Sequence, residues 1–274
     1  MSDGGAKKRW QRLMQGDGDM WNILLCGTAE IMGSALLILL ACGGVIGTTR
    51  AGVPGLLQMT LNVGLTVMLI IQIFGHISGA HINPTITLAS LILGNIGRTQ
   101  AAVHIVAQYI GTILGYGLLR LATPSGMMRA TPQEKEELFC TTILADKVSP
   151  AQGVFMEFLA TFILVLVAGA VWDQRNHNNR DSVPLKFGLT VTCLAIVFGP
   201  YTGCSMNPAR SFAPAIWNGV WQEQWIYWLG PYAGSLAGGF LYKCVFNARE
   251  VKKCDIPEAI ALNHIDTDKS QENV

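Results

Sequence analysis

Long apolar runs separated by short polar segments dominate the chain. Six of these runs are long enough to cross the apolar core of a bilayer, which takes about 17–25 residues. They lie at 21–46, 54–74, 99–121, 151–172, 184–200 and 224–246. Each run is predicted to be a membrane-spanning helix.

Two further segments, 75–94 and 201–220, are moderately apolar, rich in Gly and Pro, and too short to span a membrane alone. Irregular backbone at membrane depth is tolerated only where protein buries it or where it lines a watery cavity. Both segments are therefore predicted to be re-entrant, which means that each enters and leaves the bilayer on the same side.

Composition agrees with an integral membrane protein. Of the 274 residues, 50% are hydrophobic and 14% are charged, whereas soluble domains carry about 25% charged residues. The composition excludes a disordered chain. The net charge of +1 argues against a nucleic-acid binder, since 19 basic residues are offset by 18 acidic ones.

Basic residues predict the orientation, because they concentrate in cytoplasmic loops of membrane proteins. The N-terminal tail 1–20, the loop after the fourth run and the C-terminal end carry most of the relevant ones. They are Lys7, Lys8, Arg9, Arg12, Arg175, Arg180, Lys243, Arg249, Lys252 and Lys253. With six spans these positions share one side, so both tails (1–20 and 248–274) are expected to be cytoplasmic and the 126–150 loop extracellular.

The chain also repeats itself. Glu30 recurs as Glu157, Asn83 as Asn207 and the segment 108–111 as 231–234, at offsets of 127, 124 and 123. Each copy, 21–125 and 151–247, holds three spans. Because three is odd, the second copy must insert upside down. The two re-entrant segments then enter from opposite faces and meet near the midplane.

Each re-entrant segment contains an Asn-Pro pair followed by apolar residues. Asn is a favoured N-cap and Pro is favoured at the first helical position, so Asn83-Pro84 and Asn207-Pro208 each predict the start of a short helix. The alternative is that these pairs are ordinary helix starts in surface loops. A single Asn-Pro pair would fit that alternative well, whereas two pairs at matching repeat positions fit it poorly.

Two such helix starts at the midplane predict a passage for neutral polar molecules. Each Asn side chain can cap its helix through its oxygen and keep its NH₂ group free to donate. The two helix N-termini each carry about half a positive charge, which repels cations including hydronium. Water bound through its oxygen at both Asn residues cannot form an unbroken donor chain, which opposes proton hopping.

The two segments resemble the aquaporins, or major intrinsic proteins. The residues that carry the resemblance are Gly-His-Ile-Ser-Gly-Ala-His-Ile-Asn-Pro at 75–84 and Tyr-Thr-Gly-Cys-Ser-Met-Asn-Pro-Ala-Arg-Ser-Phe at 201–212. The resemblance covers 21–246 and implies an all-α membrane protein with six transmembrane helices and two half-helices in an inverted repeat. It further implies a homotetramer in the cell membrane, with no cofactor and no enzymatic activity.

The resemblance also implies roles for the motif residues. Pro84, Pro208 and Ala209 match the family's Asn-Pro-Ala pattern, whereas Thr85 replaces Ala in the first copy. Ala at that position packs the half-helices together, so Thr85 is expected to be tolerated.

The resemblance gives Glu30, Glu157 and His81 supporting roles. The two carboxylates are expected to hold the loops before the half-helices through backbone N–H groups, with a proton relay as the alternative. His81 is expected to support the first loop, with pH sensing as its alternative.

A selectivity filter is implied around Arg210, which lies three residues after Asn207. The alternative is an Arg that extends to the outer membrane interface. In water-selective family members, an aromatic residue and a His face this Arg, twenty residues before the first Asn and twelve before the second. Here Val63 and Ala195 hold those positions, so the constriction is expected to be wider and more apolar.

The cysteines predict little else. Seven is an odd number, and Cys26, Cys42, Cys193 and Cys244 lie inside apolar runs, where they are expected to be small core residues. No pair has metal-ligand spacing, so no metal site is expected. Cys204 lies in the segment that resembles the outer pore wall. The resemblance makes it the fourth residue of the selectivity filter, with Val63, Ala195 and Arg210, and it is expected to be reachable by mercurials.

These residues predict a passive channel for glycerol and urea, and for water. Ala215 and Cys204 stand where glycerol facilitators carry an acidic and an aromatic residue, while Tyr227-Trp228 resembles the water-selective class. The mixture resembles insect entomoglyceroporins. A strictly water-selective channel, a structural junctional protein and an ion-coupled transporter are the alternatives.

Overall fold

The computed structural model describes residues 19–46, 55–129, 131 and 135–246, and this part of the chain contains helices and no strand. The helices of the first repeat are α2 (Met20–Gly43), α3 (Leu56–Ser78), α4 (Pro84–Leu93) and α5 (Arg98–Ala122). Those of the second are α6 (Pro150–Trp172), α7 (Val183–Thr202), α8 (Pro208–Asn218) and α9 (Ile226–Leu241). Short helical turns follow at η1 (Glu136–Leu138), η2 (Gln174–Asn179) and the π-helical η3 (Tyr242–Phe246).

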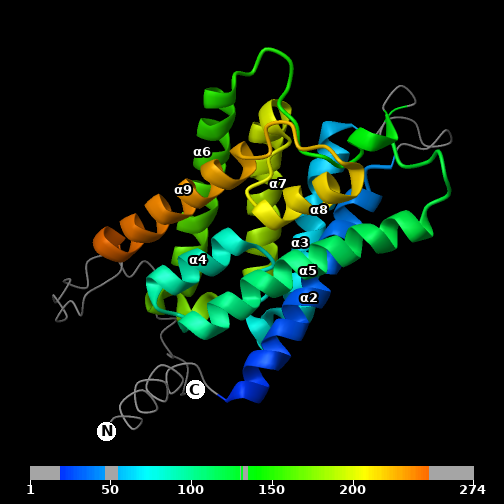
Figure 1. Cartoon of the computed structure of the whole chain (residues 1–274). Helices are drawn as coiled ribbons and strands as arrows, with labels where there is room; N and C mark the ends of the chain where they lie inside the picture. Colours follow the sequence, from blue (N-terminus) through cyan, green and yellow to red (C-terminus); the bar gives the residue numbers. More distant parts are fainter. Residues whose placement is uncertain (1–18, 47–54, 130, 132–134, 247–274) are drawn as a thin grey trace, which may run out of the picture.

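The helices pair as an inverted repeat requires. Helix α2 packs on α5 and α6 on α9, while α3 and α7 pack on each other across the repeats. Each half-helix packs on the last helix of the other repeat, α4 on α9 and α8 on α5. Figure 1 shows α4 and α8 in the middle of the bundle, between the long helices. The predicted fold class is confirmed.

Five described helices, α2, α3, α5, α6 and α7, are long and apolar enough to cross a membrane. Helix α9 has 16 residues and continues directly into η3, so the sixth apolar segment reaches residue 246. The helical part of each predicted re-entrant segment is short, with 10 residues in α4 and 11 in α8.

Two helix ends differ from the sequence prediction. The second span was expected to end at residue 74, and α3 continues to Ser78; the fifth was expected to end at 200, and α7 continues to Thr202. Each helix stops at a glycine in the left-handed region, Gly79 with φ 84° and Gly203 with φ 78°. These glycines mark the ends because other residues enter that region only at a cost.

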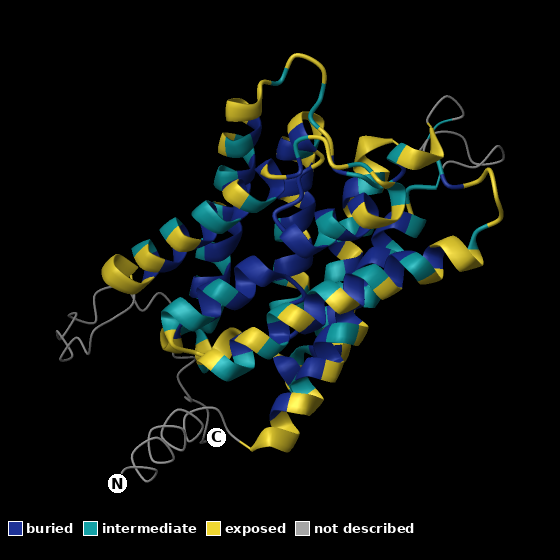
Figure 2. Cartoon of the chain, viewed as in Figure 1, coloured by how far each residue is buried: buried dark blue, intermediate teal, exposed yellow. Residues whose placement is uncertain are grey.

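Close helix crossings depend on glycine. A Cβ atom at Gly111 in α5 would fall on the backbone carbonyl of Ile31 in α2, and one at Gly234 in α9 on that of Phe158 in α6. These crossings occupy matching places in the two repeats. Figure 2 shows that the helices are buried toward the centre of the bundle and exposed on the outside, as expected for surfaces that face lipid.

The expectation that Cys42 is a simple core residue is wrong. Cys42, at the end of α2, forms a disulfide with Cys140 in the 126–150 loop, 98 residues away. Cys193 and Cys244 are exposed on the outside of this chain rather than in its core, and Cys26 is half-buried. A pairing so distant in sequence leaves no local pattern, which is why the apolar runs did not reveal it.

The two ends of the bundle differ in what they carry. The loop side holds the 126–150 loop, to which the end of α2 is tied by the disulfide. The tail side is the opposite end, where α6 stops and the Asp173 carboxylate accepts a hydrogen bond from Tyr242 of η3. Most residues of the predicted tails, 1–18 and 248–274, lie outside the described residues.

Candidate functional site

The two Asn residues begin the half-helices as predicted. The Asn83 side-chain oxygen accepts from the Thr85 backbone N–H at 2.9 Å, and that of Asn207 accepts from the Arg210 N–H at 3.2 Å. A proline follows each cap at the first helical position. Both Asn residues are almost fully buried, with 6% and 5% of their surface exposed.

The same two side chains join the half-helices to each other. Asn83 Nδ2 donates to the Met206 carbonyl at 2.9 Å, and Asn207 Nδ2 donates to the Ile82 carbonyl at 2.8 Å. These bonds are reciprocal, as expected for an inverted repeat. The whole NH₂ group of each Asn was expected to be free. Instead, one of its two N–H bonds holds the opposite loop, and the other remains for a molecule in the cavity.

Thr85 does more than occupy space between the half-helices. Its hydroxyl oxygen lies 2.8 Å from Asn83 Oδ1 and 3.1 Å from the Met206 carbonyl, and its own carbonyl accepts from Ser235 of α9 at 2.6 Å. Its counterpart Ala209 is fully buried and has no such group. The substitution therefore adds a polar contact at the point where the repeats meet.

The loops before the half-helices hold an unusual backbone. Ala80 and Ile82 in the first loop and Cys204 and Met206 in the second all have φ between 45° and 52°. Residues with side chains rarely adopt this left-handed conformation, and each costs of order 1–3 kcal/mol. The surrounding structure must therefore impose it, and it does so at matching positions of both repeats.

Glu30 and Glu157 supply that constraint. The two oxygens of Glu30 accept from the N–H groups of His81 and Ile82 at 2.9 and 2.7 Å. The Glu157 oxygens accept from Ser205 and Met206 at 2.8 and 2.7 Å. Both carboxylates are fully buried. Hydrogen bonds to charged acceptors are stronger than neutral ones, so these carboxylates fix the strained loops.

Each carboxylate also accepts from a hydroxyl at the end of the preceding helix. Ser78 donates to Glu30 at 2.7 Å, and Thr202 donates to Glu157 at 2.6 Å. Gln108 adds a further donor to Glu30 at 2.7 Å. In the sequence, Gln108 was evident only as a landmark of the repeat, and the two hydroxyls carried no signal beyond their place directly before a Gly that ends a helix.

A cavity of about 130 Å³ runs between the two repeats, several times the ~30 Å³ that one water molecule occupies in the liquid. Both Asn residues line it. So do the four predicted filter residues and His81, together with residues of both loops. They are Val63, Gly79, Ala80, His81, Ile82, Asn83, Ala195, Gly203, Cys204, Ser205, Met206, Asn207 and Arg210.

Arg210 marks the loop-side end of this cavity. Its Nη1 atom donates to the Cys140 carbonyl of the 126–150 loop at 2.9 Å. Val63 of α3 and Ala195 of α7 line the same cavity, and neither offers a side-chain hydrogen bond. Among the residues that line it in the described part of the chain, Arg210 is the one with a permanent charge.

At the tail side this cavity meets a wider one of about 640 Å³. Ile71, Gly79, Trp172 and Val183 line both. The Trp172 ring lies 5.7 Å, centre to centre, from the ring of His81, whose Nδ1 is 3.2 Å from the Thr87 hydroxyl. Trp172 was not singled out from the sequence, because a Trp at the end of an apolar run is typical of a membrane interface.

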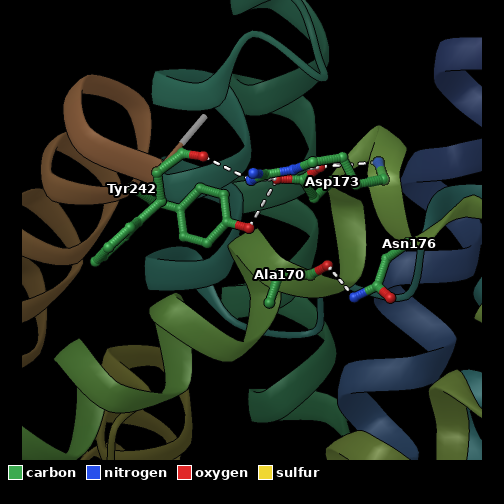
Figure 3. Close-up of polar contacts among 6 residues, drawn as sticks. Ala170, Asp173, Asn176 and Tyr242 are labelled. Atoms are coloured by element: carbon green, nitrogen blue, oxygen red, sulfur yellow. Dashed lines mark hydrogen bonds and ion pairs between the residues drawn. The ribbon is translucent and has the colours of Figure 1, made fainter. Parts of the chain in front are cut away.

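Polar contacts fix the position of Trp172 through its neighbour Asp173. Figure 3 shows the Asp173 carboxylate facing the hydroxyl of Tyr242, which donates at 3.0 Å. The Arg175 guanidinium forms an ion pair with the same carboxylate. The Arg175 side chain also donates to the Phe246 carbonyl at 2.6 Å. Its hydrogen bonds to the Asp173 carboxyl hold the pKa of that carboxyl well below the ordinary range. These contacts join the end of α6 to the end of the sixth apolar segment.

No group of three or more His, Cys, Asp or Glu side chains within the described residues could hold a metal ion. Two half-helices that meet end to end inside a bundle of spanning helices, with a cavity passing between them, define a membrane channel of the inverted-repeat type. The chain belongs to the major intrinsic protein family, whose sequence model matches residues 19–242. It is accordingly a channel protein and not an enzyme.

Individual relatives agree with this assignment. The chain is 34% identical to Aquaporin-4 of Rattus norvegicus over 260 residues, covering 90% of this chain and 78% of that protein. It is 34% identical to human Aquaporin-2, covering 79% and 77%. A solved structure, the aquaglyceroporin from Plasmodium falciparum, superposes with a TM-score of 0.72 over 82% of this chain and 97% of that one. At 21% identity that likeness establishes the fold alone.

Proposed function

We propose that this channel passes glycerol and urea together with water, and that it excludes ions and protons. The observation that carries the proposal is the lining of the cavity. Val63 and Ala195 contribute small apolar surfaces to it, and Arg210 contributes N–H donors. A polyol can place its carbon side against Val63 and Ala195 and its hydroxyls on Arg210.

Ion exclusion rests on the charges around the cavity. The N-termini of α4 and α8 meet there, and each carries about half a positive charge. Arg210 adds a full one. No carboxylate is among the described residues that line the cavity, so a cation would lose its water shell without gaining a direct partner. The remaining N–H of Asn83 and of Asn207 orients water through its oxygen and interrupts proton hopping.

The proposed orientation places the loop side outside the cell and both tails in the cytoplasm. Two independent features support it. In the sequence, basic residues are concentrated in the two tails and in the loop after α6, as they are in cytoplasmic segments. The Cys42–Cys140 disulfide lies on the loop side, and disulfides persist in the oxidising extracellular environment. We further propose a cell-membrane location and a homotetramer, in which exposed apolar faces of the long helices contact lipid and neighbouring copies.

The mixed filter supports placing the chain with the insect entomoglyceroporins, which resemble water channels that have lost the filter His. Purified channel in proteoliposomes tests the proposal through Ala195→His. The substitution adds bulk and a hydrogen-bonding group beside Arg210, so glycerol and urea flux should fall sharply while water flux persists. Ala195→Val is the matched control for added bulk without a polar group. Equal glycerol flux in wild type and Ala195→His would contradict the proposed filter.

A further inference from the structure

The guanidinium of Arg210 depends on one residue of the 126–150 loop. Its Nη1 donates to the Cys140 carbonyl at 2.9 Å, and its Nη2 lies 3.8 Å from the Cys140 sulfur. Within the described residues, both hydrogen bonds of the guanidinium go to this residue. The position of Cys140 therefore sets the position of the only permanent charge in the described lining of the cavity.

Cys140 is in turn tied to the bundle by its disulfide with Cys42, with the two Cα atoms 5.7 Å apart. Cys42 is fully buried in α2, in an apolar cluster with Ile38 and Tyr116. Helix α2 also carries Glu30, which holds the first half-helix loop. The cross-link thus connects the Arg210 contact to a helix that already fixes another part of the pore.

The backbone at Cys140 explains why a cross-link matters there. Its φ is 56°, in the left-handed region that non-glycine residues avoid. The loop is also anchored on either side, because the Phe139 carbonyl accepts from Tyr116 at 2.9 Å and Thr142 donates to Ser211 at 2.8 Å. Those contacts hold residues 139 and 142. The disulfide acts on residue 140 itself, whose conformation aims the carbonyl at the guanidinium.

We propose that the Cys42–Cys140 disulfide is a positioning element of the selectivity filter. It holds the Cys140 carbonyl in place and so keeps the Arg210 guanidinium against the wall of the pore. This inference rests on the proposed function, since it assumes that Arg210 selects permeants. Without the cross-link, residue 140 relaxes toward ordinary backbone angles, the guanidinium loses its acceptor, and it enters the passage. Glycerol, being larger, is then slowed more than water.

Two double variants without the disulfide test this inference. Cys42→Ala/Cys140→Val places a β-branched residue, which disfavours positive φ, at position 140. Cys42→Ala/Cys140→Asn places there a residue that tolerates positive φ. The expected result is a glycerol-to-water permeability ratio about fivefold below wild type in the Val variant, the effect of about one hydrogen bond. The ratio should be largely restored in the Asn variant.

A purely structural disulfide predicts a different outcome. Both variants would then lose folded protein and thermal stability alike, and each surviving channel would keep the wild-type ratio. Equal ratios in the Val and Asn variants would therefore overturn the proposal. So would free thiols at both cysteines of the purified wild type, detected by maleimide labelling without reductant. Introducing Arg210→Ala should abolish the difference between the two variants, because the cross-link acts through that side chain.

Failure of the proposed function is recognised separately. If wild type passes water and no glycerol or urea, the proposed substrate range is wrong. Water flux per channel, which requires only an open pore, then decides the role of the disulfide. A guanidinium that enters the passage should lower the water flux of the Val variant below that of the Asn variant, and equal fluxes would overturn the inference.

Discussion

Replacing Asn207 by Asp should slow permeation without unfolding the channel. Asp is as good an N-cap as Asn, so its oxygen can still accept from the Arg210 N–H. The change removes both N–H donors of the amide. One of them holds the Ile82 carbonyl at 2.8 Å, where a carboxylate oxygen would instead face another acceptor. The other is the donor that remains for a passing molecule.

The magnitude follows from the number of bonds lost. A hydrogen bond contributes about 1 kcal/mol net, which corresponds to about a fivefold change in rate for each donor missing at the barrier. Displacement of the opposite loop adds to this, so at least a fivefold fall in water and glycerol flux per channel is expected. The new negative charge also offsets the two helix N-termini, so cation leak should rise.

Stopped-flow measurements on proteoliposomes with quantified channel content provide the assay. Asn83→Asp should behave similarly, because Asn83 makes the reciprocal bond to the Met206 carbonyl. Asn207→Ala is the matched control, since it removes the cap as well as the donors and should lower thermal stability further. Normal flux in both Asp variants, at wild-type abundance, would refute the donor role of the two Asn residues.

Three further predictions concern the rest of the pore. Mercurials should block flux and Cys204→Ser should remove the block, because Cys204 lines the cavity; undiminished block would assign it to another cysteine. Glu157→Ala leaves the buried N–H groups of Ser205 and Met206 without their acceptor. At about 1–3 kcal/mol for each group, this should cost about 2–6 kcal/mol of folding stability and lower the melting temperature. An unchanged melting temperature would exclude the supporting role of Glu157. Asp173→Asn should lower thermal stability by a margin that is constant above about pH 5 and shrinks as pH falls below about 4, because the pKa of Asp173 is lower in the folded than in the unfolded state and its contribution falls once the unfolded state begins to bind a proton. A margin that does not change with pH would argue against the charged contact.

The paired features of the chain were the predictable part. Asn83 and Asn207 begin the half-helices at the expected residue, because capping and the proline that follows are local effects. The inverted arrangement followed from counting spans in each copy. Helix ends were less predictable, since α3 continues through a glycine at 75 to Ser78.

Contacts between distant segments were not predictable from local patterns. The Cys42–Cys140 bond and the Cys140 carbonyl that receives Arg210 both join the 126–150 loop to the bundle. Neither Cys42 nor Cys140 belongs to a sequence motif, and their separation of 98 residues leaves no local sign of the pairing. Trp172 was missed for a similar reason, since its place between the two cavities depends on how α6 ends.

The central claim is that the loop-side constriction admits solutes larger than water. Permeabilities to water, glycerol and urea, measured side by side in proteoliposomes containing the wild-type channel and in empty vesicles, test it directly. Glycerol and urea flux should lie clearly above that of empty vesicles. Glycerol and urea flux equal to that of empty vesicles, together with high water flux, would identify a strict water channel and refute the wide constriction.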